Sequence, residues 1–162
     1  MRKHLLYAGT LLALAIPAMG HADVVVTGVG PRVGLSLSPD QLVLGGHLVV
    51  NEIAPDVTFN PNVEFGFGDD YTVIAVNLDS LYHFRIQDSA WRPHVGFGLG
   101  INFIEADLPA PFRDVSNTEV GANLIVGAEV PTRSNNRFFT EARFGLGDIP
   151  DLKLMAGWTF PL

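Results

Sequence analysis

The segment that decides the fold is LKLMAGWTF, residues 152–160, which alternates between two kinds of side chain. Successive side chains of a β-strand point to opposite faces, so every second residue shares a face. One face of this segment is apolar throughout, and it carries Leu152, Leu154, Ala156, Trp158 and Phe160. The nine residues approach the length of a tilted transmembrane strand, about 9–11 residues. The segment is therefore predicted to be a strand with one continuous apolar face.

The same alternation recurs upstream, most clearly in HVGFGLGINF, residues 94–103. It predicts eight strands, at residues 32–38, 41–50, 62–68, 74–85, 94–103, 119–129, 138–147 and 152–160. Short turn signals separate most of them, so consecutive strands are predicted to pair antiparallel. A few apolar residues interrupt the alternation, namely Val43, Val49, Leu81, Ile125 and Phe139.

Glycine dominates the second face of these strands, and this decides which face points outward. Glycine on a solvated strand face weakens the strand and covers nothing. Inside a narrow eight-stranded barrel, by contrast, glycine leaves room for the larger side chains that fill the interior. The charged residues on this face are nearly balanced, four positive and five negative: Arg32, Arg85, Arg143, Lys153, Glu64, Asp79, Glu119, Glu129 and Glu141. We therefore predict an interior ion-pair network that plugs the barrel, with the apolar face turned to lipid.

Aromatic residues give a second indication of a membrane. If the N-terminus lies in the periplasm, one set falls at periplasmic strand ends: Tyr82, Phe84, Trp91, Phe138, Trp158 and Phe160. A second set falls at or near the outer ends: Phe67, Tyr71, Phe103 and Phe144. Two aromatic girdles around an aliphatic band are typical of transmembrane barrels.

The first 22 residues have the features of a secretory signal peptide. Arg2 and Lys3 precede the apolar stretch 5–15, Pro17 ends it, and small residues predict cleavage after Ala22. The apolar stretch is shorter than the roughly 20 residues of a transmembrane helix. We expect a mature domain of 140 residues, 23–162. An uncleaved membrane anchor is the alternative.

Charge and composition exclude several function classes. Without residues 1–22, the formal charge changes from −7 to −9, with 17 acidic and 8 basic residues. No basic patch remains, which argues against a nucleic-acid partner. The chain has no cysteine, so it has no disulfide, no thiolate nucleophile and no lipid-anchored N-terminal cysteine.

With these features, the chain resembles the OmpA-like superfamily of small outer-membrane β-barrels, which includes OmpX-like and OmpW-like members. The resemblance covers the whole mature chain. Its most specific element is the C-terminal strand, Leu152 to Phe160, which is similar to the signal read by the outer-membrane assembly machinery. That signal usually ends with an aromatic residue, whereas Pro161 and Leu162 follow here. The resemblance implies an all-β, eight-stranded antiparallel up-and-down transmembrane barrel. It also implies a monomer in the outer membrane, in contact with lipid and lipopolysaccharide.

The sequence assigns no catalytic, cofactor-binding or metal residue. Asp79 and His83 are predicted to face inward, but Ser80 faces lipid, so a nucleophile and its base are separated. His47 and His94 also face inward. The strands of these histidines are not all adjacent and their spacing gives no close ligand pair, so hydrogen bonding is favoured over metal binding. Glu119 and Glu129 lie on one strand about 33 Å apart, too far for a catalytic carboxylate pair.

Two connections are longer than the others. The segment 105–117 contains Pro109 and Pro111, and its Phe112 is a candidate contact for a partner, lipopolysaccharide or a ligand. The connection from Asn51 to Pro61 is long for a periplasmic turn. It shortens if the third strand begins near Val57, in which case Pro61 is expected to need a bulge.

The leading hypothesis is a non-enzymatic outer-membrane barrel with a structural role, or one that passes only very small solutes in a porin-like manner. A soluble periplasmic barrel that binds an apolar ligand, as a lipocalin does, is the second hypothesis. A small outer-membrane enzyme acting on lipid is the third.

Overall fold

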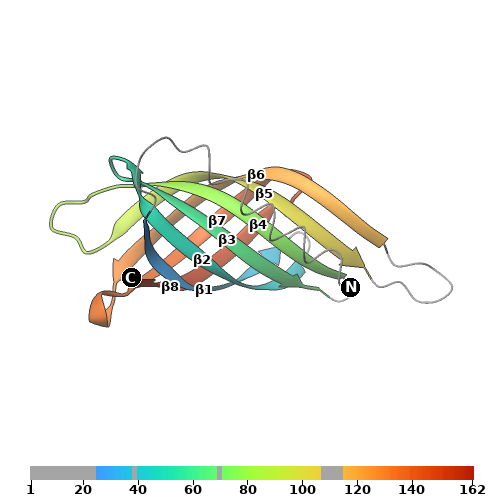
Figure 1. The fold of residues 1–162 in the computed structure, drawn as a ribbon, viewed down its shortest axis with the longest axis horizontal. Coiled ribbons are helices and arrows are strands. Elements are labelled where there is room, and N and C mark those ends of the chain that lie inside the picture. The colour runs from blue at the N-terminus through green and yellow to red at the C-terminus, as the bar shows by residue number, and fades with distance from the viewer. Residues whose placement is uncertain (1–24, 38–39, 69–70, 107–114) are drawn as a thin grey trace.

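A computed structural model describes residues 25–37, 40–68, 71–106 and 115–162. The predicted signal peptide and most of segment 105–117, including Phe112, lie outside these residues. Eight strands make up the described chain (Figure 1). Their bounds are β1 Val26–Leu37, β2 Asp40–Ala54, β3 Val57–Phe67, β4 Tyr71–His83, β5 Arg92–Ala106, β6 Val115–Pro131, β7 Arg137–Gly147 and β8 Leu152–Pro161.

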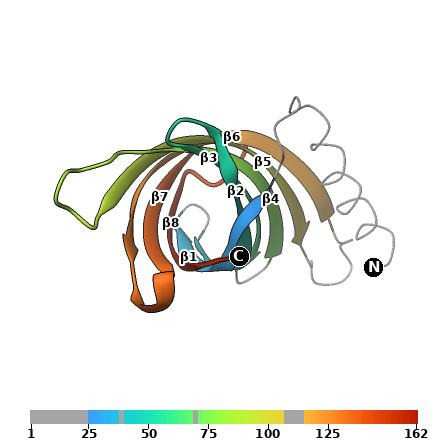
Figure 2. The same cartoon turned by 60° about the vertical axis from the view of Figure 1, so that its left-hand side comes forward.

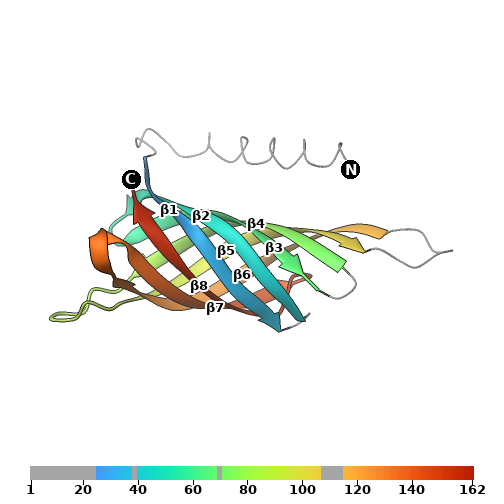
Figure 3. The same cartoon turned by 90° about the horizontal axis from the view of Figure 1, so that it is seen from below.

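The strands form one closed barrel in the order β1 to β8, and every neighbouring pair is antiparallel. The ring of strands is visible when the barrel is turned towards its end (Figure 2). β8 closes the barrel by pairing with β1, for example at Val33↔Ala156 (Figure 3). The predicted eight-stranded up-and-down barrel is confirmed. The only helix among the described residues is the short 3-10 turn Arg133–Asn135, and no described helix is long and apolar enough to cross a membrane.

The two ends of the barrel differ in their connections. The C-terminal end carries the start of β1, the end of β8, and the turns β2–β3, β4–β5 and β6–β7. The far end carries the other four connections. There β5 and β6 continue as a paired hairpin up to Ala106↔Val115, beyond the last β6–β7 pair, Gly121↔Gly147 (Figure 1). The predicted long segment 105–117 is therefore partly strand.

The connection between β2 and β3 is a tight turn. β2 ends at Ala54 and β3 begins at Val57, which confirms the early start of the third strand. The turn between them contains Asp56 with a positive φ of 60°, a conformation that aspartate tolerates better than most residues. The apparent eleven-residue connection was strand with irregular pairing rather than loop.

The expected bulge at Pro61 is wrong. The β2–β3 register passes from His47↔Asn62 to Val50↔Phe59 without a shift, and β4 pairs regularly with Pro61 at Leu78. The register shifts instead between Val50 and Glu52 and between Glu52 and Ala54. The extra residues of β2 therefore lie beside the turn, at the exposed end of the strand. Proline has no backbone N–H, so it removes a single hydrogen bond between the strands. The strand accommodates this loss without a bulge.

The two faces of the sheet have the predicted polarity. Large apolar side chains cover the outside, for example Leu35 at 52%, Phe97 at 50% and Leu99 at 55% exposure. Arg143 and Asn123 are fully buried inside. The apolar residues that interrupted the alternation are mostly interior residues, because Val43, Leu81, Ile125 and Phe139 are all buried and Val49 is half-buried.

Interior glycines leave space for polar side chains. A Cβ atom added to Gly98 would lie 1.9 Å from Asp79 Oδ1, and one added to Gly100 would lie 2.8 Å from Asn77 Oδ1. Both distances are too short for real atoms. The glycines of the inward face therefore leave the space that the polar interior side chains occupy, as the sequence predicted.

Candidate functional site

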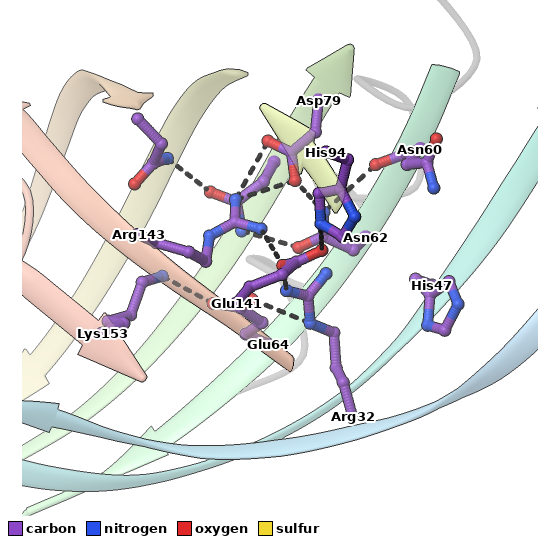
Figure 4. A network of polar contacts seen from close by, with 12 residues as sticks. Arg32, His47, Asn60, Asn62, Glu64, Asp79, His94, Glu141, Arg143 and Lys153 are labelled. Atoms are coloured by element: carbon purple, nitrogen blue, oxygen red, sulfur yellow. Dashed lines mark hydrogen bonds and ion pairs between the residues drawn. The ribbon is translucent and has the colours of Figure 1, made fainter. Parts of the chain in front are cut away.

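The middle of the barrel holds a buried network of ion pairs (Figure 4). Arg143 of β7 is its most enclosed member, with a fully buried side chain. One guanidinium nitrogen, Nη2, lies 2.8 Å from Asp79 Oδ2, and the other, Nη1, lies 3.4 Å from Glu141 Oε2. This arginine thus links β4 to β7 through the interior.

A second arginine joins this pair to the other side of the barrel. Arg32 Nη2 lies 2.9 Å from Glu141 Oε2, and Arg32 Nε lies 3.2 Å from Glu64 Oε1. Lys153 Nζ donates to Glu64 Oε2 at 2.6 Å. The network therefore spans β1, β3, β4, β7 and β8, and contains three cations and three anions. Because isolated buried charges are costly, this balance is what makes so polar a core tolerable.

Asparagines extend the network towards β6. Asn62 Nδ2 donates to Asp79 Oδ2 at 2.7 Å, and Asn77 Nδ2 donates to Asn62 Oδ1 at 2.9 Å. Asn123 Nδ2 donates to Asn77 Oδ1 at 3.4 Å. These neutral amides thereby connect the charged network to β6.

Six of the nine predicted interior charges belong to this network: Arg32, Glu64, Asp79, Glu141, Arg143 and Lys153. Arg85 was predicted wrongly. β4 ends at His83, so Arg85 lies in the following turn with a side chain 70% exposed. There it pairs with Asp56, whose carboxylate raises the pKa of Arg85. Glu119 is also outside the network, since it is half-buried near the far end and accepts from Asn117.

The third predicted charge outside the network, Glu129, lies near the C-terminal end with partners that the sequence analysis missed. Its Oε1 lies 3.2 Å from both Arg92 Nη1 and Arg137 Nη1. Both arginines begin strands, just outside the predicted bounds 94–103 and 138–147. If the predicted fifth strand began two residues earlier and the seventh one residue earlier, the alternation would have placed both arginines on the inward face.

The far end is closed by the turn between β7 and β8. Ile149 and Pro150 are buried, and Gly145 N donates to Asp151 O at 2.8 Å, so this turn folds back into the barrel. A Cβ on Gly121 would lie 2.8 Å from Ile149 Cγ1, which shows how closely the turn fills the interior. A small cavity of about 10 Å³ lies beside Lys153 and Pro150. The sequence predicted a short turn here, but not that Ile149 and Pro150 would form a plug inside the barrel.

The C-terminal end holds a larger cavity of about 150 Å³. Its lining includes Arg32, Asp79 and Glu141 of the network, which form its inner boundary. Exposed residues such as Thr27 and Asn135 line it as well. This space is large enough for several water molecules. It is therefore a polar vestibule that ends at the ion-pair network.

All three predicted inward histidines are buried and line this vestibule. His47 Nε2 lies 2.9 Å from Thr159 Oγ1, with its ring edge-on to Phe139. His83 Nε2 lies 3.0 Å from Thr58 Oγ1. His94 Nε2 lies 3.4 Å from Glu141 Oε1. Within the described ranges, no group of three or more His, Cys, Asp or Glu side chains could hold a metal ion.

The residues that were considered for hydrolytic chemistry do not assemble. Asp79 is engaged by Arg143 and Asn62, and His83 contacts Thr58. Ser80 is half-buried on the outward parity of β4, between the buried Asp79 and Leu81. The side chains thus point to opposite sides of the barrel wall, as predicted.

Comparison with solved structures identifies similar folds. The N-terminal β-barrel domain of Pseudomonas aeruginosa OprF matches with a TM-score of 0.68 and 16% identity, over 85% of this chain and 98% of that chain. Neisserial surface protein A, NspA, matches with a TM-score of 0.64 and 15% identity, over 84% of this chain and 96% of that chain. The de novo designed TMB2.3 matches with a TM-score of 0.50 and 10% identity, over 88% and 98%. No protein-family model and no curated protein matches the sequence. At these identities, the likeness concerns the fold alone.

Proposed function

We propose that this chain, which has the fold of the small OmpA-like barrels, is a non-enzymatic integral outer-membrane protein with a closed interior. The observation that carries the proposal is the inversion of polarity across the barrel wall. Leucine, valine and phenylalanine cover the outside, while six paired charges fill the inside. A contiguous apolar surface of this extent is unfavourable in water and suits acyl chains.

The exposed aromatic residues support the same environment. Tyr82, Phe84, Trp91, Trp158 and Phe160 are 42–54% exposed at or near the C-terminal end. Phe67 and Phe144 are 48% and 45% exposed towards the far end. Aromatic rings favour the membrane interface, so the two groups fit the two boundaries of a bilayer.

The soluble lipocalin-like alternative requires the opposite arrangement. A barrel that binds an apolar ligand in water needs an apolar interior and a polar exterior. Here the largest fully buried side chains include Arg143, Glu64, Asn77, Asn123 and Asp79. The vestibule is not an apolar chamber, because histidines, arginines and carboxylates line it. The cavity of about 10 Å³ beside Lys153 is too small for such a ligand.

In the proposed orientation the N-terminus lies in the periplasm, which puts the C-terminal end of the barrel there as well. The barrel would then contact lipid along its apolar outer surface and lipopolysaccharide around the far end. β8 would serve as the recognition signal for the assembly machinery. The protein would act as a monomer in the structure of the envelope, passing at most very small solutes.

The test combines location with conformation. Membrane fractionation should recover the protein with the outer membrane, and the unheated protein should migrate differently from the boiled protein on a denaturing gel. Recovery of a folded protein in the soluble periplasmic fraction would overturn the proposal. Lipid A and phospholipid profiles should be unchanged when the protein is deleted, and an altered profile would overturn the non-enzymatic part.

A further inference from the structure

His83 and His94 form a cross-strand pair inside the vestibule. They are direct partners in the β4–β5 register, and their ring centroids lie 5.4 Å apart. Both side chains line the vestibule and are buried, at 4% and 2% exposure. Nδ1 of each ring has no hydrogen-bond partner among the described residues. Because an unpaired buried polar atom is costly, these two nitrogens indicate a partner that comes from outside the chain.

The contacts of the other ring nitrogen determine what this partner must offer. Thr58 Oγ1 donates its one proton to Asn60 Oδ1 at 2.7 Å, so it accepts from His83 Nε2 at 3.0 Å. His94 Nε2 lies 3.4 Å from Glu141 Oε1, and a carboxylate oxygen only accepts. In an uncharged ring the proton therefore lies on Nε2, and Nδ1 is an acceptor. The partner must donate a hydrogen bond to each ring.

The charges at the inner boundary of the vestibule are already paired. Glu141 Oε2 lies 2.9 Å from Arg32 Nη2, and Asp79 Oδ2 lies 2.8 Å from Arg143 Nη2. A charge brought in by a ligand would have no buried counter-charge left to pair with, and an unpaired buried charge is expensive. This arrangement favours an uncharged ligand.

The surroundings of His83 disfavour both signs of charge. Glu129 Oε1 lies 3.8 Å from His83 Nδ1, so an anion at this nitrogen would meet a carboxylate. Arg92 Nη1 and Arg137 Nη1 each lie 3.2 Å from the same oxygen, so a cation would meet two guanidinium groups. An uncharged donor at His83 avoids both repulsions.

The remaining lining of the vestibule combines polar groups with apolar side chains. Asn60 and Asn135 line it, and so do Leu81 and Phe139. A polyol matches this mixture, because its hydroxyl groups both donate and accept, while its carbon chain can pack against apolar side chains. The cavity of about 150 Å³ restricts the ligand to a small one, and exposed residues such as Asn135 lie at its mouth.

We propose that the vestibule binds one small uncharged polyol, whose hydroxyl groups donate to Nδ1 of His83 and Nδ1 of His94. The carboxylates and arginines around these rings stay paired with one another and select against charged ligands. This inference goes beyond the proposed function and does not depend on it, because the site lies inside the barrel.

The experiment uses the untagged chain 23–162, the predicted mature protein, folded in lauryldimethylamine oxide micelles, because sugar-based detergents would themselves offer hydroxyl groups. His47, His83 and His94 are then its only histidines, since the other two of the five lie in residues 1–22. Glycerol is the probe, and nitrogen NMR follows the histidine rings. The His83 and His94 signals should shift saturably, with half-saturation at about 1–10 mM for so small a ligand.

Two charged relatives of glycerol test the requirement for an uncharged ligand. Glycerate carries a carboxylate, and serinol carries an ammonium group in place of the central hydroxyl. Each should bind at least about 10-fold more weakly than glycerol, because its charge would enter a region where the charges are already paired. Equal or tighter binding of either relative would overturn the proposal.

Substitution of the rings tests the two contacts. His83→Phe and His94→Phe keep a ring but remove both nitrogens, and each should weaken glycerol binding about 5- to 10-fold, as loss of one hydrogen bond does. Gln41→Leu is the matched control, because Gln41 is a buried polar side chain at the small cavity beside Lys153. This variant should bind glycerol as the unaltered chain does. Heat-modifiable migration checks that each variant is folded.

The unaltered chain provides a readout that does not rely on the folding of variants. Both rings should carry their proton on Nε2, and nuclear Overhauser effects should connect glycerol with the ring protons of His83 and His94. The proposal is overturned if the shifts do not saturate, if either ring carries its proton on Nδ1, or if these effects come from water alone. It is also overturned if Gln41→Leu weakens binding as much as His94→Phe.

Discussion

The guanidinium of Arg143 lies 2.8 Å from the carboxylate of Asp79, and this contact joins opposite halves of the sequence within the interior. Replacing Asp79 by Asn leaves the arginine charge buried without its shortest ion pair, although Glu141 still lies 3.4 Å away. Loss of one partner of a buried pair typically costs about 3–5 kcal/mol. We expect Asp79→Asn to lower the free energy of unfolding by an amount of this order, measured by urea unfolding of the barrel in lipid vesicles.

The exposed pair between Arg85 and Asp56 provides the control. Arg85 is 70% exposed, and solvent screening leaves an exposed ion pair with little effect on stability. Arg85→Gln should therefore leave the unfolding curve nearly unchanged. If both substitutions have equal effects, the interior network does not stabilise the barrel in the way described.

A charge placed on the outward face tests the lipid environment. Leu99 lies in the middle of β5 and is 55% exposed. Leu99→Arg should destabilise the folded barrel in a bilayer by about 2–4 kcal/mol, the cost of arginine near the midplane. Val120 also faces outward, at 61% exposure, but lies beyond the last β6–β7 pair at the far end. Val120→Arg should cost about 0–1 kcal/mol, as near an interface. A larger loss for Val120→Arg than for Leu99→Arg would contradict the proposed membrane position.

A single methyl group tests the turn that closes the far end. A Cβ on Gly121 would lie 2.5 Å from Leu146 O and 2.8 Å from Ile149 Cγ1, so neither backbone nor plug has room for it. Gly121→Ala should cost about 1–3 kcal/mol, as overpacking typically does, and should make residues 148–151 more accessible to protease. Gly46→Ala is the control, because the nearest atom to its Cβ would be Gly30 O at 3.7 Å. Equal behaviour of the two variants would mean that the turn is not packed as described.

Strand number, pairing order and the polarity of each face followed from the sequence because the alternation has a period of two and extends over whole strands. The inward positions of Arg32, Glu64, Asp79, Glu141, Arg143 and Lys153 followed for the same reason. Strand ends were less predictable. Arg85 falls on the inward parity, yet β4 ends two residues earlier, and parity has no meaning once the pairing stops.

Contacts across the barrel were beyond sequence reasoning. The alternation shows that His83 and His94 face inward, but not that the hairpin register pairs them. Register depends on the turn 84–91, whose geometry no short motif specified. The inward fold of Ile149 was hidden for a related reason, because a turn rich in Gly, Asp and Pro is usually solvated.

The conductance of the barrel in planar bilayers tests whether the interior is closed at two levels. The vestibule of about 150 Å³ ends at Arg32, Asp79 and Glu141, and a small cavity of about 10 Å³ lies on the other side, beside the turn that contains Ile149 and Pro150. The unaltered protein should therefore give currents near the background. Ile149→Gly with Pro150→Gly should also stay near the background, because the fully buried Arg143 still blocks the middle.

Adding Asp79→Ser and Arg143→Ser removes a matched pair of charges and both blocking side chains, and should produce resolvable single-channel currents. Because that combination keeps the net charge unchanged, a new current would report open space rather than an altered field. Large, stable currents from the unaltered protein would contradict a closed interior.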